Sequence, residues 1–344
     1  MGFLTTEHKI LFFVFLSSLI VLLLSNHLLT LFLALESQVL SYLILLSSGR
    51  GLLILEGILK YFYVSALASA LFLIIFWLIL NSSGTLSLPL FHSSYLILLI
   101  PLFFFKFSLF PMHFFFPTLL EVSPLYLLPF WSAWSKLGVL LFFLKLFSSL
   151  PLILLTLSWL IGASGAVHQT RIVRVLAYSS INTMAWVLWG GILGFPLGTS
   201  FHVSFLLIYF ITLFGIVYSS ELLGFYSTMS VVMLGLTPAL YSSILLILFL
   251  GLLGFPPLGG FLFKWSIISN SFMHGSYIIP LVALLISALA IYYVVRLISF
   301  FYFSQMGYRK ILFQPLSPNT NTILSTLIVF LLFLLWFRLF TFII

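Results

Sequence analysis

The stretch that decides the fold spans residues 102–117 and reads LFFFKFSLFPMHFFFP. It places Lys106, Pro111, His113 and Pro117 inside a run of phenylalanine and leucine. Such a run must lie in lipid or packed protein, where a lysine costs roughly 2.5–3.5 kcal/mol on insertion scales. Each proline also removes a helix hydrogen bond. A broken helix carrying an ionisable group is typical of transporter ion sites, because the freed backbone groups then face a cavity.

The composition of the whole chain indicates a membrane protein. Of 344 residues, 63% are hydrophobic and only 5% are charged, whereas soluble proteins carry about 25% charged residues. There is no cysteine, so the chain offers no disulfide, no thiolate ligands for an iron–sulfur cluster and no cysteine-based zinc site. The formal net charge of +8 suits anchoring at a lipid surface better than binding nucleic acid.

Hydrophobic segments of about 20 residues, the length that crosses a bilayer, predict eleven transmembrane helices. They cover residues 8–25, 28–46, 55–80, 94–116, 124–147, 150–168, 172–193, 200–222, 237–273, 277–302 and 322–342. The ninth span is interrupted at GFPPLGG, residues 254–260, with Lys264 just beyond. The predicted fold class is therefore an all-α polytopic membrane protein, with a single transmembrane domain over residues 1–344.

The two interrupted spans predict an internal repeat. Spans four and nine occupy corresponding places in consecutive groups of five, which gives repeat one at about 8–147, repeat two at about 150–302 and a final helix at about 322–342. An odd number of spans reverses the chain direction across the membrane, so the two repeats have inverted topology. Paired interrupted helices of this kind indicate a transport site.

The basic residues near the span ends predict the orientation. One side of the membrane receives most of them: Lys9, Arg50, Arg171, Arg174, Arg309 and Lys310. The other side receives mainly Lys145 and Arg338. By the positive-inside rule, the N-terminus lies inside and the C-terminus outside.

Four ionisable side chains fall at membrane depth, namely Glu36, Lys106, Lys136 and Lys264. Intramembrane acids and bases usually pair or relay protons, and burial and pairing shift the pKa of a lysine in opposite directions. A row of such sites passes a proton along by changing partners, without a bound cofactor.

Each of these charges also has a structural interpretation. Glu36 could persist as a hydrogen-bonded neutral acid, and Lys106 could snorkel to an interface. Lys136 could make cation–π contacts with Trp131 and Trp134. Lys264 could anchor the membrane boundary beside Trp265.

Two further sites are less specific. His113, two residues after Pro111, is interpreted either as a buried structural histidine or as a relay between Lys106 and water. Glu56 and Lys60 lie four residues apart, which predicts an ion pair on a helix surface. GLLGFPPLGG lacks the Gly-Lys-Ser/Thr ending of a phosphate-binding loop, which argues against nucleotide binding.

Five motifs resemble one known family, the mitochondrially encoded NADH dehydrogenase subunit 2 chains, which are antiporter-like membrane subunits of respiratory complex I. The motifs follow one another in the family's order over nearly the whole chain. They are KYFYVSALAS at 60–69, KFSLFPMHFFFP at 106–117, WSAWSKLG at 131–138, HQTRIVRVLAYSSI at 168–181 and GLLGFPPLGGFLFKW at 251–265. Departures occur at Thr183 and Ala185, where relatives often have His and Gly, and at Ser108 and Phe115, where Gly and Trp are common.

The resemblance implies a proton-translocating subunit of NADH:ubiquinone oxidoreductase in the mitochondrial inner membrane, with its N-terminus in the matrix. It places Glu36, Lys106, Lys136 and Lys264 on the family's proton path. NADH, FMN, iron–sulfur clusters and ubiquinone would act in other subunits, so this chain would bind no cofactor. The expected partners are other membrane subunits of the complex, including neighbouring antiporter-like subunits, and membrane lipids.

Two other functions stay open at this point. A stand-alone cation/proton antiporter would exchange ions as a purified chain in liposomes. A structural subunit would use its charges only to fix helix packing.

Overall fold

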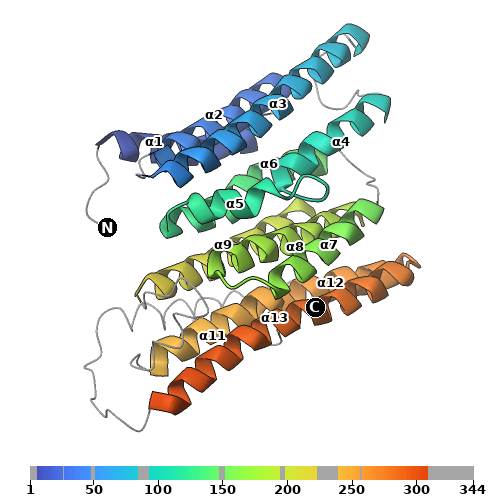
Figure 1. Ribbon diagram of the computed structural model, residues 1–344. Coiled ribbons are helices and arrows are strands. Elements are labelled where there is room, and N and C mark those ends of the chain that lie inside the picture. The colour runs from blue at the N-terminus through green and yellow to red at the C-terminus, as the bar shows by residue number, and fades with distance from the viewer. Residues whose placement is uncertain are drawn as a thin grey trace. The chain divides into compact units, whose positions relative to one another are not determined.

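The structure is a computed structural model that describes residues 6–25, 27–47, 51–83, 93–146, 152–193, 198–222, 239–255 and 258–308. Within these ranges the regular elements are all helices, as the sequence predicts (Figure 1). The chain divides into two compact units, Met1–Leu154 and Leu155–Ile344.

The first unit is a helical bundle around the first interruption. Its elements are α1 (Thr6–Leu24), α2 (Leu28–Ser47), α3 (Leu52–Ser83), α4 (Ser93–Phe107), α5 (Phe115–Val122), the 3₁₀ turn η2 (Leu125–Leu127), the π-helical η3 (Phe130–Trp134) and α6 (Ser135–Leu146). Helix α1 packs against α2 and α6, and α3 packs against α2, α4 and α5.

The second unit contains the second interruption. Its elements are α7 (Leu152–Val167), which starts at the division between the units, α8 (Ile172–Ile192), α9 (Gly198–Leu222), α11 (Ala239–Leu253), α12 (Gly259–Met273) and α13 (Ile278–Tyr308). Helix α9 packs against α8, α11 and α12, and α13 packs against α11 and α12.

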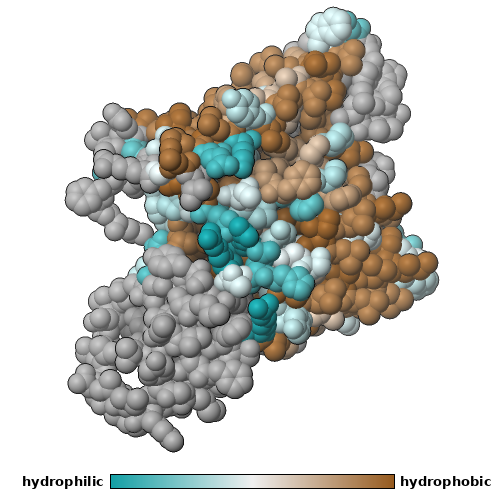
Figure 2. All heavy atoms as spheres, viewed as in Figure 1, coloured by the Kyte–Doolittle hydropathy of each residue, from teal (hydrophilic) through white to brown (hydrophobic). Residues whose placement is uncertain are grey.

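Four of the described helices contain segments long and apolar enough to cross a membrane: Leu29–Ser47, Ile54–Leu78, Phe201–Glu221 and Ile278–Arg296. Shorter apolar helices cover His8–Leu24, Leu125–Leu141 and Leu152–Val167. Hydrophobic residues cover much of the visible surface of the described helices (Figure 2), and α3 exposes Leu67 and Trp77. The predicted eleventh span, residues 322–342, lies outside the described residues.

Both predicted interruptions are present, and both helices end in the same local geometry. At the end of α4, the amide of Ser108 donates to Phe105 and the amide of Leu109 donates to Phe104, with Ser108 at a φ of 58°. This is the Schellman pattern that ends a helix with one left-handed residue. Helix α4 therefore ends before Pro111, whereas the sequence predicted a span that continued to residue 116.

The end of α11 repeats the pattern with a glycine. The amide of Gly254 donates to Gly251, and that of Phe255 donates to Leu250. Gly254 has a φ of 77°, which glycine adopts without the steric cost of a Cβ atom. The prolines at 256 and 257 lie outside the described residues, so the described part of the break rests on Gly254.

Candidate proton-transfer site

The ion pair between Glu36 and Lys106 is the centre of the site in the first unit. Lys106 Nζ donates to Glu36 Oε1 at 3.1 Å. Lys106 lies in the last turn of α4, directly before the break, and Glu36 lies in the middle of α2. The side chains are 14% and 22% exposed, respectively. Glu36 thus pairs with a lysine, as the sequence predicted.

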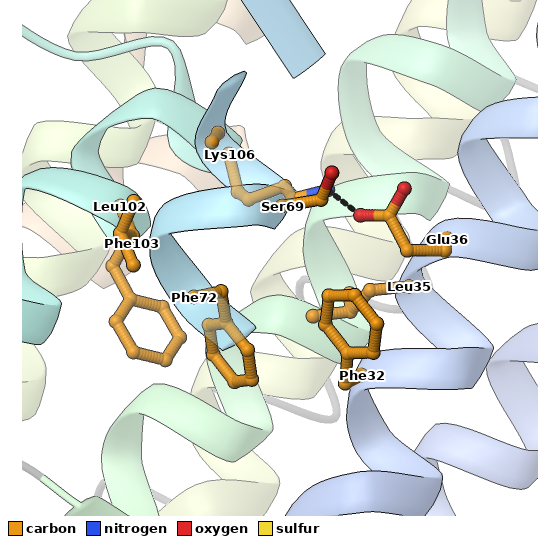
Figure 3. Close-up of a pocket in the computed structure, with 9 residues that line it drawn as sticks. Phe32, Leu35, Glu36, Ser69, Phe72, Leu102, Phe103 and Lys106 are labelled. Atoms are coloured by element: carbon orange, nitrogen blue, oxygen red, sulfur yellow. Dashed lines mark hydrogen bonds and ion pairs between the residues drawn. The ribbon is translucent and has the colours of Figure 1, made fainter. Parts of the chain in front are cut away.

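A small pocket opens beside this pair (Figure 3). It is lined by Phe32, Leu35, Glu36, Ala68, Ser69, Phe72, Leu102, Phe103 and Lys106. Its volume of about 20 Å³ is enough for one water molecule, which needs roughly 10–15 Å³ on this scale. The polar groups of Glu36, Lys106 and Ser69 face it from three helices, and phenylalanine rings form much of the remaining wall.

A cluster of aromatic side chains lies near the acid. Tyr61 of α3 is buried and lies close enough to Glu36 to interact with its charge. The Tyr61 ring meets Trp131 edge to face at 5.5 Å, and Trp131 stacks on Tyr42 at 4.0 Å. This packing holds α2 and α3 against the π-helical turn, so the carboxylate has a fixed and mostly apolar surrounding.

Lys136 is the most deeply buried of the four charges, with 1% of its surface exposed. It is the second residue of α6 and follows the π-helical turn η3 directly. Its ammonium lies 4.1 Å from the centre of the Phe116 ring of α5. The sequence suggested Trp134 as one ring partner, but residues two apart on a helix do not face each other.

His113 lies in the connection between α4 and α5, where its ring contacts Phe110 and Phe114. Its Nδ1 atom is buried without a regular hydrogen bond to any described residue. Because α4 has ended at Phe107, His113 is not on the helix that carries Lys106. Its relay role stays a prediction.

Lys264 forms the site of the second unit. It lies on α12, and its Nζ reaches back across the break to donate to the carbonyl of Leu253 at 2.5 Å. The ammonium also lies 5.5 Å from the centre of the Trp186 ring of α8. Trp265, the predicted interfacial neighbour, is 58% exposed and points elsewhere on the helix. A helix-end carbonyl, which has no partner within its own helix, thus serves as the acceptor for Lys264.

The predicted surface pair also forms. Lys60 Nζ lies 2.6 Å from Glu56 Oε1, and both side chains are well exposed. This pair is separate from the buried site and resembles an ordinary i,i+4 helix pair.

Three features of the site were not predicted from sequence. The π-helical turn before Lys136, the Leu253 carbonyl that binds Lys264 and the burial of Tyr61 beside Glu36 all depend on tertiary packing. The tryptophan–lysine element at 131–138 gave the only hint of the first, since π-helical turns often occur at functional sites.

A family model matches residues 25–290, and it describes the transmembrane region of NADH:quinone oxidoreductases and Mrp antiporters. The chain belongs to this NADH:quinone oxidoreductase/Mrp antiporter family. The resemblance inferred from the five motifs is thereby confirmed.

Relatives within the family are similar over most of their length. The NADH-ubiquinone oxidoreductase chain 2 of Metridium senile is 32% identical over 83% of this chain and 80% of its own. The chain 2 of Loxodonta africana is 30% identical over 90% of this chain and 87% of its own.

Solved structures share the fold of this chain. A chain of respiratory complex I from Thermus thermophilus has a TM-score of 0.78 and 26% identity, over 96% of this chain and 78% of its own. A chain of the archaeal membrane-bound sulfane sulfur reductase has a TM-score of 0.84 and 21% identity, over 98% of this chain and 74% of its own.

The chain offers few side chains that could bind a metal ion or an iron–sulfur cluster. The sequence has no cysteine, and in the part of the chain that the structure describes, no three His, Asp or Glu side chains are grouped to hold a metal ion. The buried polar side chains of the described residues include the amine of Lys136, the amides of Gln38 and Asn182, the imidazole of His202 and several serine and threonine hydroxyls.

Proposed function

We propose that this chain is the proton-translocating, antiporter-like subunit of NADH:ubiquinone oxidoreductase. The observation that carries the proposal is the Glu36–Lys106 ion pair, 3.1 Å long and placed at the break between α4 and α5. The similarity to chain 2 subunits from two animals supports the assignment to this complex.

Proton transfer in the first unit would follow from changes of charge pairing. When the contact between Glu36 and Lys106 opens, Lys106 would change partners and pass its proton on. Lys136, whose positive charge is stabilised by the Phe116 ring, is the next proposed acceptor.

In the second unit, Lys264 would bind a proton for release. Its ammonium donates a hydrogen bond to the Leu253 carbonyl. The proposed relay thus comprises Glu36, Lys106 and Lys136 in one unit and Lys264 in the other, with His113 as an additional candidate.

The chain would contribute to the enzyme without a redox centre of its own. NADH oxidation and quinone reduction would occur in other subunits with their own cofactors, and the resulting change in charge would reach this chain as a shift in ion pairing. The partners proposed are the other membrane subunits of the complex and membrane lipids.

We further propose a multi-pass location in the mitochondrial inner membrane, with the N-terminus in the matrix. The excess of basic residues on that side supports the orientation. The inverted five-helix repeats, at about 8–147 and 150–302, are part of the same proposal. The division into units Met1–Leu154 and Leu155–Ile344 and the similar ends of α4 and α11 support them.

Replacing Lys106 or Lys264 with methionine tests the function. We expect the assembled complex, reconstituted in liposomes, to lose proton translocation, because methionine keeps the side-chain length but carries no proton. Protons moved per NADH oxidised would be measured, with the exposed Lys60→Met as the matched control. Normal assembly with wild-type proton flux in both variants would contradict the proposal.

A stand-alone cation/proton antiporter is the second candidate, because the family description includes Mrp antiporters. It predicts that the purified chain alone exchanges cations for protons in liposomes. Failure of exchange by the chain, together with pumping by the complex, would exclude it.

A further inference from the structure

A cluster of buried hydroxyl groups lies between α8 and α9 in the second unit. We name Ser179, Ser180, Thr183 and Tyr209 the hydroxyl cluster; all four are buried. Ser179, Ser180 and Thr183 share one side of α8, since residues three and four apart on a helix are neighbours. The Tyr209 hydroxyl faces these three side chains from α9.

The hydrogen bonds within α8 leave the oxygen atoms of its three hydroxyl groups able to accept a hydrogen bond from the Tyr209 hydroxyl. Ser179 donates to the carbonyl of Leu176, Ser180 to that of Ala177 and Thr183 to that of Ser180. Each hydroxyl hydrogen is thus used within α8, while the oxygen lone pairs can still accept. The Tyr209 hydroxyl is buried among these oxygens, although none of them is in regular hydrogen-bond geometry with it. They are therefore the acceptors within its reach.

The position of Tyr209 relates it to the second helix break. On the same helix, the Ile208 side chain packs over Gly259 at the start of α12, and the Thr212 methyl packs over Gly251 near the end of α11. Tyr209 therefore lies at the level of the interruption, where Lys264 reaches back to the Leu253 carbonyl.

Helix α8 also places the cluster near Lys264. Trp186, whose ring faces the Lys264 ammonium, follows Thr183 by three residues and so lies on the same side of α8. The Lys264 ammonium and the hydroxyl cluster therefore lie next to each other along α8, at the level of the break between α11 and α12.

We propose that Tyr209 is a proton-transfer residue, and that the hydroxyl cluster is the path by which Lys264 exchanges its proton. This inference rests on the proposed function. As Lys264 passes from ammonium to amine, its proton moves through water onto one hydroxyl oxygen, and that hydroxyl passes its original proton to the next. The last hydroxyl gives its proton to a water molecule, so each hydroxyl, including the phenol, ends neutral and the net change is one proton moved from Lys264 to that water.

Tyr209→Phe tests the proposal, because it removes the hydroxyl and keeps the ring. In the assembled complex in liposomes we expect proton translocation to fall roughly tenfold or more, since positioned proton-transfer groups contribute about 10²–10⁴-fold to a rate. Tyr292→Phe is the control, because Tyr292 is 58% exposed and should pump normally.

Variants of Thr183 separate chemistry from packing. Thr183→Val keeps the shape but loses the hydroxyl, and should lower pumping and change its solvent deuterium isotope effect. Thr183→Ser keeps the hydroxyl and should retain both. These two variants decide the question if Tyr209→Phe fails to assemble.

The outcomes distinguish the two proposals. Wild-type pumping by Tyr209→Phe, or equal pumping by the valine and serine variants, overturns the hydroxyl path. If Lys264→Met has lost pumping in the same assay, the proposed function stands. If Lys264→Met and Lys106→Met both pump normally, that function is wrong as well.

Discussion

At the scale of single residues, Glu36 and Lys106 show how a membrane protein tolerates charges at depth. Neither side chain is fully buried, and each supplies the counter-charge that the other needs. A second acid and lysine, Glu56 and Lys60, form a shorter contact of 2.6 Å on an exposed surface. Both are pairs of a glutamate and a lysine, so they differ mainly in burial. Breaking the less exposed pair, Glu36 and Lys106, should therefore lower stability more than breaking the exposed pair.

Glu36→Gln is expected to destabilise the protein by about 1.5–3 kcal/mol, since hydrogen bonds to charged groups contribute roughly that much. The substitution leaves Lys106 without its counter-charge in a largely apolar surrounding. Thermal unfolding of the purified complex in detergent, followed at this subunit, measures the effect. Glu56→Gln is the control and should leave the unfolding temperature unchanged; equal shifts in both variants would contradict the argument.

At the scale of elements, both interrupted helices end in a left-handed residue, and the residue types differ. Gly254 takes this conformation freely, whereas Ser108 has a Cβ atom that disfavours it. The motif resemblance predicted a glycine at the position of Ser108. Why the chain retains a serine beside Lys106 has no explanation in the structure.

Two substitutions at these helix ends should have opposite effects on stability. Ser108→Gly should raise the free energy of unfolding by roughly 1 kcal/mol, because it removes the Cβ cost of a left-handed residue. Gly254→Ala should lower it, because the new Cβ would lie 2.9 Å from the carbonyl oxygen of Gly260. Chemical or thermal unfolding of the detergent-purified complex measures both.

Gly275→Ala is the control for the second substitution. Gly275 also has a positive φ, of 73°, but a Cβ there meets no atom within 4 Å. Gly275→Ala therefore measures only the cost of a Cβ atom on a left-handed backbone. If Gly254→Ala costs no more than Gly275→Ala, close packing across the break is not important for stability.

At the scale of the whole molecule, the orientation in the membrane follows from charge and from the order of the helices. The connection between α7 and α8 carries Arg171, and Arg174 follows in the first turn of α8, whereas the connection between α12 and α13 carries no lysine or arginine. In the predicted eleven-span order these connections lie on opposite sides of the membrane.

Single cysteines test this orientation, because the natural chain has none. Thr170→Cys places a thiol at an exposed position in the connection between α7 and α8, and Met273→Cys places one at the exposed last residue of α12. A membrane-impermeant maleimide added to right-side-out mitochondrial membranes should label the cysteine at 273 and not the one at 170. Inverted vesicles should give the reverse pattern, and the same labelling in both preparations would refute the orientation.

The sequence by itself determined the helical class, the two breaks and the residue types at the candidate site. These follow from local properties: apolar length, residues that favour a turn, and charges too costly to bury without a function. Only the tertiary structure decided which charges meet. Glu36 and Lys106 are 70 residues apart, and the acceptor of Lys264 is a backbone carbonyl, which no residue type reveals. The hydroxyl cluster was missed for the same reason, because a serine or tyrosine has the same local pattern whether it faces lipid, packing or a path for protons.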